Sequence, residues 1–154
     1  ALNPIDGSID VLPTSTISIT FNEYVRLTDN TEATSTNVDA LITLKDTDAS
    51  GTDIPFDATI NSTKTVITID PTADFASEQT VYFAISASLE DTLDHATSAA
   101  SATLKMKDVI VPTVTFDPTN GSYDVPGNRN ITLTFSESIR NIDDSEITDS
   151  KSLV

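Results

Sequence analysis

Two stretches of this chain, offset by 114 residues, are copies of each other. Residues 3–26 read NPIDGSIDVLPTSTISITFNEYVR, residues 117–140 read DPTNGSYDVPGNRNITLTFSESIR, and the two align without a gap. Self-similarity at a period of about one hundred residues is typical of tandem small domains, because the units of solenoids are shorter. The chain is therefore predicted to be one repeat followed by the beginning of a second. Ten of the twenty-four aligned positions are identical, namely Pro4/Pro118, Gly7/Gly121, Ser8/Ser122, Asp10/Asp124, Val11/Val125, Ile17/Ile131, Thr20/Thr134, Phe21/Phe135, Glu23/Glu137 and Arg26/Arg140.

The repeat divides the 154 residues into two unequal parts. Residues 1–110 are predicted to be a complete domain, and residues 111–154 are predicted to be the linker and the N-terminal part of a second domain. The second part is too short to bury a core of its own, since chains of about 40 residues usually need a disulfide, a metal or a partner. The chain has no cysteine, which removes the disulfide and excludes the small disulfide-rich secreted class.

The chain is strongly acidic, with a net charge of −16 and only eight Lys and Arg residues. This balance disfavours nucleic acid as a partner, because phosphate binding needs clustered cations. It suits either a solvated surface or the binding of cations. No apolar run reaches the length of a membrane span, and Ala1 opens no basic-then-apolar leader, so we expect an internal fragment without its own signal peptide.

Short runs of β-branched residues alternate with polar turns, a pattern that predicts strands rather than helices. Ile17, Ile19 and Phe21 alternate with Ser18 and Thr20, so one face of this strand should lie in a core. Seven or eight such strands in about 110 residues predict an all-β, antiparallel β-sandwich. Further strands are predicted at residues 41–45, 54–60, 66–70, 80–88 and 103–107.

Three further segments of the sequence give predictions of their own. Residues 28–39 are polar and lack periodicity, which indicates a loop with at most one short helical turn. The strand at residues 80–88 has apolar side chains on both faces, so we expect it in the middle of a sheet with both faces covered. Residues 89–101 are predicted to be a long polar loop before the last strand.

The order of these motifs resembles the bacterial immunoglobulin-like (Ig-like) domains of the S-layer and large surface-adhesin type. The motifs are P-x-x-G-x-x-D-V at residues 4–11, I-x-I-T-F-x-E at residues 17–23, T-x-I-T-I-x-P at residues 65–71 and D-x-x-D at residues 91–94. The resemblance covers residues 3–107 and, as a truncated copy, residues 112 to about 150.

The resemblance implies an Ig-like sandwich, an extracellular or cell-surface location, and a non-catalytic role as a spacer or adhesion module beside neighbouring Ig-like repeats. The chain departs from the family in the loop at residues 90–96, where the family usually shows D-x-x-G-N and this sequence has Asp91-Thr-Leu-Asp94-His95. That departure puts a ligand-binding role of the loop in doubt.

One polar turn has the spacing of a calcium-binding loop. Asp46, Asp48 and Ser50 place oxygen atoms at the first, third and fifth positions of an EF-hand-like loop, and Gly51 stands at the sixth. The flanks argue against this reading, because strands are predicted on both sides and Asp53 occupies a position that is normally apolar. A plain hairpin turn selects the same residue types, so both readings stay open.

A sandwich topology also gathers carboxylates at its two ends. Glu23, Asp91 and Asp94 are expected at one end, where a preceding repeat would dock. The acidic turns near Asp6, Asp46 and Asp70 are expected at the other end, beside Asp108 in the linker. Calcium prefers several carboxylate and carbonyl oxygens, so it is a candidate ligand at either end. Solvated loop tips are the alternative.

Catalytic chemistry has little support in the sequence. His95 is the only histidine, and no sequence motif around it supports a Ser-His-Asp or Cys-His arrangement. We therefore interpret His95 as a loop residue. The alternative function is a carbohydrate-binding accessory sandwich of a secreted polysaccharide-degrading enzyme. Such modules stack sugars on aromatic rings, and this chain offers no Trp and three tyrosines, Tyr24, Tyr82 and Tyr123.

The second copy raises a question of burial. Ile131, Leu133, Phe135 and Ile139 should belong to a core whose remaining strands are missing from residues 111–154. Apolar side chains beside an unpaired strand edge favour association. The sequence therefore predicts self-association through the truncated second repeat.

Overall fold

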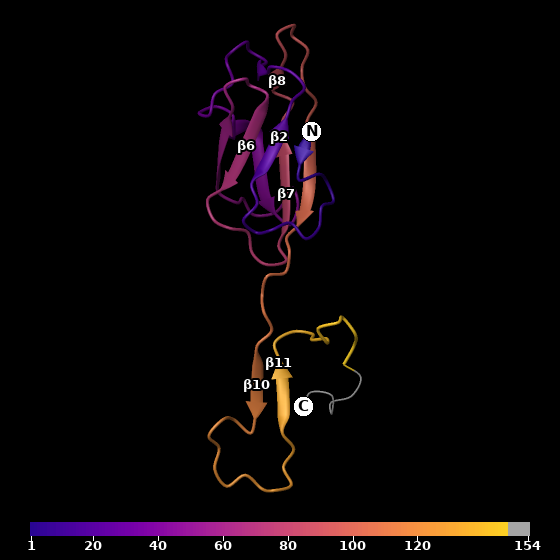
Figure 1. Cartoon of the computed structure of the whole chain (residues 1–154). Coiled ribbons are helices and arrows are strands. Elements are labelled where there is room, and N and C mark those ends of the chain that lie inside the picture. The colour runs from indigo at the N-terminus through magenta and orange to yellow at the C-terminus, as the bar shows by residue number, and fades with distance from the viewer. Residues whose placement is uncertain (148–154) are drawn as a thin grey trace. The chain divides into compact units, whose positions relative to one another are not determined.

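The computed structural model describes residues 1–147, which form two compact units, the first spanning Ala1–Val109 and the second beginning at Ile110 (Figure 1). The regular structure of both units is β-sheet, apart from one turn of 3₁₀ helix, η1 (Asp39–Leu41). None of the helical structure in residues 1–147 is long and apolar enough to cross a membrane.

The first unit is a sandwich of two antiparallel sheets. One sheet has the strand order β1-β2-β6-β5 and the other has the order β4-β7-β9. A two-stranded ribbon, β3-β8, lies at the end of the sandwich where the chain passes from one sheet to the other (Figure 1). The strands are β1 (Leu2–Asn3), β2 (Ile17–Thr20), β3 (Arg26–Leu27), β4 (Ile42–Asp46), β5 (Phe56–Ile60), β6 (Val66–Pro71), β7 (Thr80–Ile85), β8 (Leu89–Glu90) and β9 (Ala100–Lys105).

The core lies between the two sheets and is built by alternation along their central strands. In β2 and β6, Ile17 pairs with Ile69 and Ile19 pairs with Ile67, and all four side chains are buried. The facing sheet contributes the buried residues Leu44, Val81, Phe83, Ala102 and Leu104. Alternating β-branched residues therefore produce the predicted sandwich, because period-two burial places every second side chain in the core.

The N-terminal segment belongs to both sheets. After β1 pairs with β2, the chain crosses over, and Val11 forms a parallel bridge with Met106. The Val11 amide donates to the Lys105 carbonyl at 3.2 Å, and the Lys107 amide donates to the Val11 carbonyl at 2.7 Å. The segment thus closes one open side of the sandwich.

The structure corrects three expectations. The last strand, β9, begins at Ala100 rather than at residue 103, because its pairing with Ile85 of β7 extends it. The predicted long loop contains β8, whose partner is β3. The strand β7 is central in its sheet as predicted, but its outer face is only half-buried, at Tyr82 and Ala84.

The second unit is the truncated second copy. Its two strands, β10 (Val114–Asp117) and β11 (Thr132–Phe135), pair antiparallel. Phe116 faces Leu133 and Asp117 faces Thr132, which is the register of Leu2 with Ile19 and of Asn3 with Ser18 in the first unit. Within residues 1–147 β11 pairs with β10 and with no other strand.

Candidate functional site

The hairpin loop, residues 46–53, is stabilised by its own side chains. The Asp48 Oδ1 accepts hydrogen bonds from the Ser50 amide at 2.8 Å and from the Ser50 hydroxyl at 2.6 Å. These two donors lower the pKa of Asp48, the hydroxyl more than the amide. Asp48 and Ser50 therefore form a local turn motif that needs no ion.

The remaining carboxylates of the hairpin loop are also engaged. The Gln79 Nε2 donates to the Asp46 Oδ1 at 3.1 Å, and the Lys45 Nζ donates to the Asp53 Oδ1 at 2.7 Å. Calcium would have to displace these donors to gather the four predicted oxygen ligands of the loop. Lys45 and Gln79 lie outside the loop's spacing pattern, so the pattern alone could not reveal them.

The glycine of the loop has a steric explanation. A Cβ atom at Gly51 would lie 1.6 Å from the Asp46 carbonyl oxygen, far closer than atoms can approach. The loop closes through the Gly51 amide, which donates to the Asp48 carbonyl at 3.0 Å, and the Asp46 amide, which donates to the Thr52 carbonyl at 2.9 Å. Glycine is therefore required here by the tight turn, whatever the loop binds.

The apical cluster gathers six charged or titratable residues at the end of the sandwich that carries the β3-β8 ribbon. Its members are Glu23, Arg26, Glu90, Asp91, Asp94 and His95. Arg26 and Glu90 pair directly across the ribbon. Glu90 is 6% exposed and Asp91 is 9% exposed, and they are the buried charged residues of the described part of the chain. Buried carboxylates need partners, so their contacts decide what the cluster can do.

Arg26 neutralises two of these carboxylates. Its Nε donates to the Glu90 Oε1 at 3.0 Å, and its terminal nitrogen donates to the Asp94 Oδ1 at 2.6 Å. Glu90 and Asp94 lie more than sixty residues from Arg26 in the sequence, so this ion pair fastens the loop after β8 to the first half of the sandwich. A guanidinium group suits this role because it presents several donors in a fixed plane.

Asp91 organises the loop that follows β8. Its Oδ1 accepts the amides of Leu93 at 2.6 Å and His95 at 3.0 Å, and its Oδ2 lies 2.8 Å from the His95 Nδ1. The hydrogen bond from the His95 amide is the largest influence lowering the pKa of Asp91. The hydrogen bond with Asp91 is the largest influence raising the pKa of His95, and the charges of Asp91, Glu23 and Asp94 add to it. Asp91 is therefore favoured in its negative form, and the neighbouring His95 imidazole binds its proton more tightly than a free imidazole does.

Sequence reasoning located half of the apical cluster. Glu23, Asp91 and Asp94 were expected together, and the charges of all three act on His95. Arg26 and Glu90 were missed, although the identity of Arg26 and Arg140 in the two copies was a usable signal. The interpretation of His95 as a loop residue is correct but incomplete, because its ring is also the partner of Asp91.

Asp108 lies at the opposite end of the sandwich. The Ser77 hydroxyl donates to the Asp108 Oδ1 at 2.9 Å and accepts the Val109 amide at 3.0 Å. Across residues 1–147 no group of three or more His, Cys, Asp or Glu side chains is arranged to hold a metal ion. Calcium binding by Asp46, Asp48, Ser50, Asp53, Glu23, Asp91, Asp94 or Asp108 stays a prediction.

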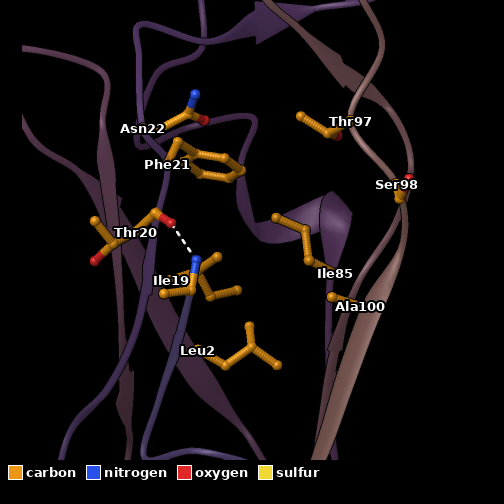
Figure 2. Close-up of a pocket in the computed structure, with 10 residues that line it drawn as sticks. Leu2, Ile19, Thr20, Phe21, Asn22, Ile85, Thr97, Ser98 and Ala100 are labelled. Carbon is orange, nitrogen blue, oxygen red and sulfur yellow. Dashed lines mark hydrogen bonds between the residues drawn. The ribbon is translucent and has the colours of Figure 1, made fainter.

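An apolar groove of about 490 Å³ opens between the two sheets at the side of β1 (Figure 2). Leu2, Ile19 and Phe21 line one side of the groove and Ile85 lines the other, with Thr97 and Ser98 at the rim. The Thr20 amide donates to the Ala1 carbonyl at 2.8 Å and keeps the first residue against β2. The side chains that line the groove are uncharged, so it can accept an apolar group.

The tyrosines do not build a sugar-stacking platform. Tyr24 and Tyr123 are exposed, but they belong to different units of the chain, and Tyr82 is half-buried on the outer face of β7. Stacking of a sugar ring needs an exposed aromatic face with polar groups beside it. The described tyrosines therefore give the carbohydrate-binding alternative no particular support.

Among solved structures, domains 1–6 of the surface layer protein SbsC are similar, with a TM-score of 0.46 and 13% sequence identity. The similarity covers 72% of this chain and 14% of that one, so the chain spans a small part of that protein's length. No curated protein matches the sequence. Residues 1–105 match the family described as the bacterial Ig-like domain. The chain, through the sandwich of residues 1–105, thus belongs to the family of bacterial Ig-like domains.

Proposed function

We propose that this chain is a non-catalytic spacer module in a tandem array of Ig-like repeats, in a bacterial protein that works outside the cell or on its surface. The domain boundaries belong to the proposal. Residues 1–110 are one complete repeat, and residues 111–154 are the linker and the first part of the next. Neighbouring repeats of the same polypeptide are its partners.

The observation that carries the proposal is the agreement between the two copies in strand register. Leu2 pairs with Ile19 and Phe116 pairs with Leu133, and these are equivalent positions at the offset of 114 residues. Two domains of the same type in direct succession are what a repetitive array requires. The short segment between them contains Pro112, which limits the conformations of a linker.

The contacts of the charged residues support a structural role. Glu90 and Asp91 are the buried carboxylates, and their partners are Arg26 and His95. These pairs fasten a loop to the sandwich.

The location is tested on intact cells of the source bacterium. Antibodies against residues 1–105 should label cells that have not been permeabilised, and brief protease treatment should remove the label. A cytoplasmic protein serves as the control that neither treatment reaches. Labelling that appears only after permeabilisation would contradict the surface part of the proposal.

The spacer role is tested on chains with one, two or three head-to-tail copies of residues 1–114, the full period of the repeat, so that each junction contains Pro112. Small-angle X-ray scattering should show a maximum dimension that grows in proportion to the number of copies, since each repeat adds its own length. A matched series should have Pro112 and its neighbours in the linker replaced by Gly and Ser, which lowers stiffness. If the native and the Gly/Ser series give the same dimensions, the linker does not limit bending.

Stiffening by calcium is the part of the proposal that rests on sequence alone. A ligand that binds only the folded state raises its stability by about 2.7 kcal/mol at a hundredfold excess over its Kd. The hypothesis therefore expects a higher melting temperature in millimolar calcium than in EDTA. Asp46→Ala with Asp48→Ala should remove the increase if the hairpin loop binds the ion, and Glu23→Ala with Asp91→Ala should remove it if the apical cluster does. Identical melting curves would reject both sites.

A further inference from the structure

The N-terminal segment and the last strand of the first unit run side by side in the same direction. Val11 forms its parallel bridge with Met106, and residues 6–11 follow residues 103–107 toward the same end of the sandwich. The strand pairs of the first unit are antiparallel, so this parallel pairing is of a different kind. We call residues 6–11 and residues 103–107 together the terminal pair.

The terminal pair is held by a group of hydrogen bonds. The Gly7 amide donates to the Thr103 carbonyl at 3.0 Å, and the Thr103 amide donates to the Asp6 Oδ1 at 2.8 Å. The Lys105 amide donates to the Ser8 carbonyl at 2.9 Å. With the two bonds of the parallel bridge described above, four backbone bonds and one side-chain bond join the two segments.

The residues that shape this segment recur in the second copy. Gly7 and Asp10 have positive φ angles of +77° and +55°, a backbone geometry that glycine adopts most easily. These turns lead the chain away from β2 and onto β9. Half of the ten identical positions of the two copies lie in this stretch, at Pro4, Gly7, Ser8, Asp10 and Val11.

Tension along the chain would load the terminal pair in shear. Ala1 lies beside Thr20 at the end of β2 that leads to the apical cluster, and the chain leaves the first unit beyond Asp108, at the opposite end (Figure 1). Pulling on these two ends draws residues 6–11 toward the apical cluster and residues 103–107 away from it. Because the two segments are parallel, their hydrogen bonds lie across the line of force and share it. The bonds must therefore break together.

We propose that the terminal pair is a mechanical clamp, which lets the domain carry tension between its neighbours without unfolding. The inference goes beyond the proposed spacer role and rests on it only for the source of the tension, since a repeat in a surface array carries any force that acts on the array. The strand β1 precedes the clamp in the path of the force, but it pairs over two residues only. Its loss leaves the clamp in place.

Two aspartates that make the same kind of hydrogen bond test the clamp. The Asp6 Oδ1 accepts the Thr103 amide inside the clamp, and the Asp39 Oδ1 accepts the Ala58 amide on the edge strand β5, both at 2.8 Å. At constant force Asp6→Ala should unfold about fivefold faster, because it removes one of the bonds that must break together. Asp39→Ala should change this rate by less than about twofold, because its bond is still intact when the clamp breaks.

Optical tweezers attached to the two ends of the 154-residue chain measure these rates. Unfolding of the first unit is recognised by a gain in length of up to about 390 Å, the extent of 109 stretched residues. Urea unfolding of the same variants is the control, and it should show that both are folded and weakened to a similar degree. Equal acceleration by Asp6→Ala and Asp39→Ala under force would overturn the proposal.

The direction of pulling gives an independent test. The chain has no cysteine, so Leu12→Cys with Val109→Cys provides two handles at positions that are 54% and 53% exposed. Both positions lie at the same end of the clamp, and pulling on them peels its hydrogen bonds apart one after another. We expect the clamp to open at less than about half of the force needed when the same variant is pulled from its two ends.

Equal forces in the two directions would overturn the clamp. They would leave the spacer proposal standing, because the location of the protein and the length of the array are measured separately. Labelling only of permeabilised cells would have the opposite effect, since it contradicts the surface array and leaves the mechanical result unchanged.

Discussion

Residues 3–26 and residues 117–140 have closely similar backbones in different surroundings. Gly7 and Gly121 have φ angles of +77° and +82°, and Asp10 and Asp124 have φ angles of +55° and +54°. The same hydrogen bonds close the same turns, because the Ser8 amide donates to the Ile5 carbonyl at 3.1 Å and the equivalent pair in the second copy also measures 3.1 Å. These features need only neighbours along the chain, so both copies have them.

Burial separates the two copies. The apolar residues of β2 lie in a core completed by β6 and by the facing sheet, and those of β11 lie at the surface of a two-stranded sheet. Arg26 reaches Glu90 across the sandwich, whereas Arg140 reaches only Asp144, four residues away, at 3.1 Å. Equivalent residues therefore contribute unequally to stability, because within residues 1–147 the long-range partners are seen for the first copy only.

The largest expected difference concerns the isoleucine that the copies share. Ile17→Ala should lower the free energy of unfolding by about 3 kcal/mol, because it removes a fully buried side chain and leaves a cavity. Ile131→Ala removes the same atoms from an exposed position and should change it by less than about 0.5 kcal/mol. Urea unfolding of the full 154-residue chain, followed by circular dichroism, measures both. Similar losses for the two variants would show that Ile131 is buried in solution.

The next largest loss of stability is expected at one of the two glycines that have ordinary φ angles. Gly51→Ala should destabilise the first unit by about 2 kcal/mol, because the new methyl group would collide with the Asp46 carbonyl. Gly127→Ala, in the second unit, meets nothing within 4 Å and is the matched control. If Gly51→Ala melts at the temperature of the parent chain, the hairpin loop opens at little cost and its closed form does not explain the glycine.

The shared arginine gives a smaller difference. Arg26→Ala should cost about 1–2 kcal/mol, because it leaves the buried Glu90 without its partner. Arg140→Ala breaks an ion pair whose side chains are both largely exposed and should cost less than about 0.5 kcal/mol. Combining Arg26→Ala with Glu90→Gln should restore part of the loss, since the uncompensated charge is then removed. No rescue in the double variant would mean that packing of the arginine, and not its charge, is what matters.

The smallest effect is the pH dependence of the apical cluster in the first unit. The folded state raises the pKa of His95, so this residue stabilises the fold below pH 6.5 and loses its contribution as the pH rises through the folded pKa. The folded state lowers the pKa of Asp91, so its contribution is present above pH 3.8 and is lost as the pH falls through the folded pKa. The pair should therefore stabilise the chain most between these two values.

Nuclear magnetic resonance measures this directly, because His95 is the only histidine. Its titration midpoint should lie above 6.5 in the parent chain and return toward that value in Asp91→Asn. The stability lost in His95→Gln should be larger at about pH 5 than at about pH 8. A midpoint that Asp91→Asn leaves unchanged would show that the 2.8 Å contact does not hold in solution.

Strand prediction succeeded where the strand carries its own pattern. The expected segments at residues 17–21, 41–45, 54–60, 66–70 and 80–88 each overlap an observed strand, because alternation of β-branched residues is a local signal. The two-residue strands β1, β3 and β8 were not predicted. They are too short to show alternation and exist because a distant partner supplies their hydrogen bonds.

The candidate site also combines features that local sequence predicts with features that depend on distant partners. The loop composition placed Asp91 and Asp94 at one end of the sandwich, but the contacts of Arg26 and Glu90 depend on the pairing of β3 with β8. The spacing of Asp46, Asp48 and Gly51 suggested an ion, whereas the structure shows donors from Ser50 and Gln79 beside the carboxylates. The spacing of residues in the sequence shows which oxygen atoms a loop can offer to an ion. Only the folded structure shows which hydrogen-bond donors already occupy those oxygen atoms.

The sequence by itself determined the repeat, the fold class and the turn geometry of both copies, since these depend on composition and on neighbours within a few residues. Within residues 1–147, the tertiary structure decided which of two equivalent isoleucines is buried and which arginine holds a buried carboxylate. The physical reason is that burial and ion pairing need groups brought together from far along the chain. Ile17 meets Ile69, and the described part of the second copy has no residue to meet Ile131.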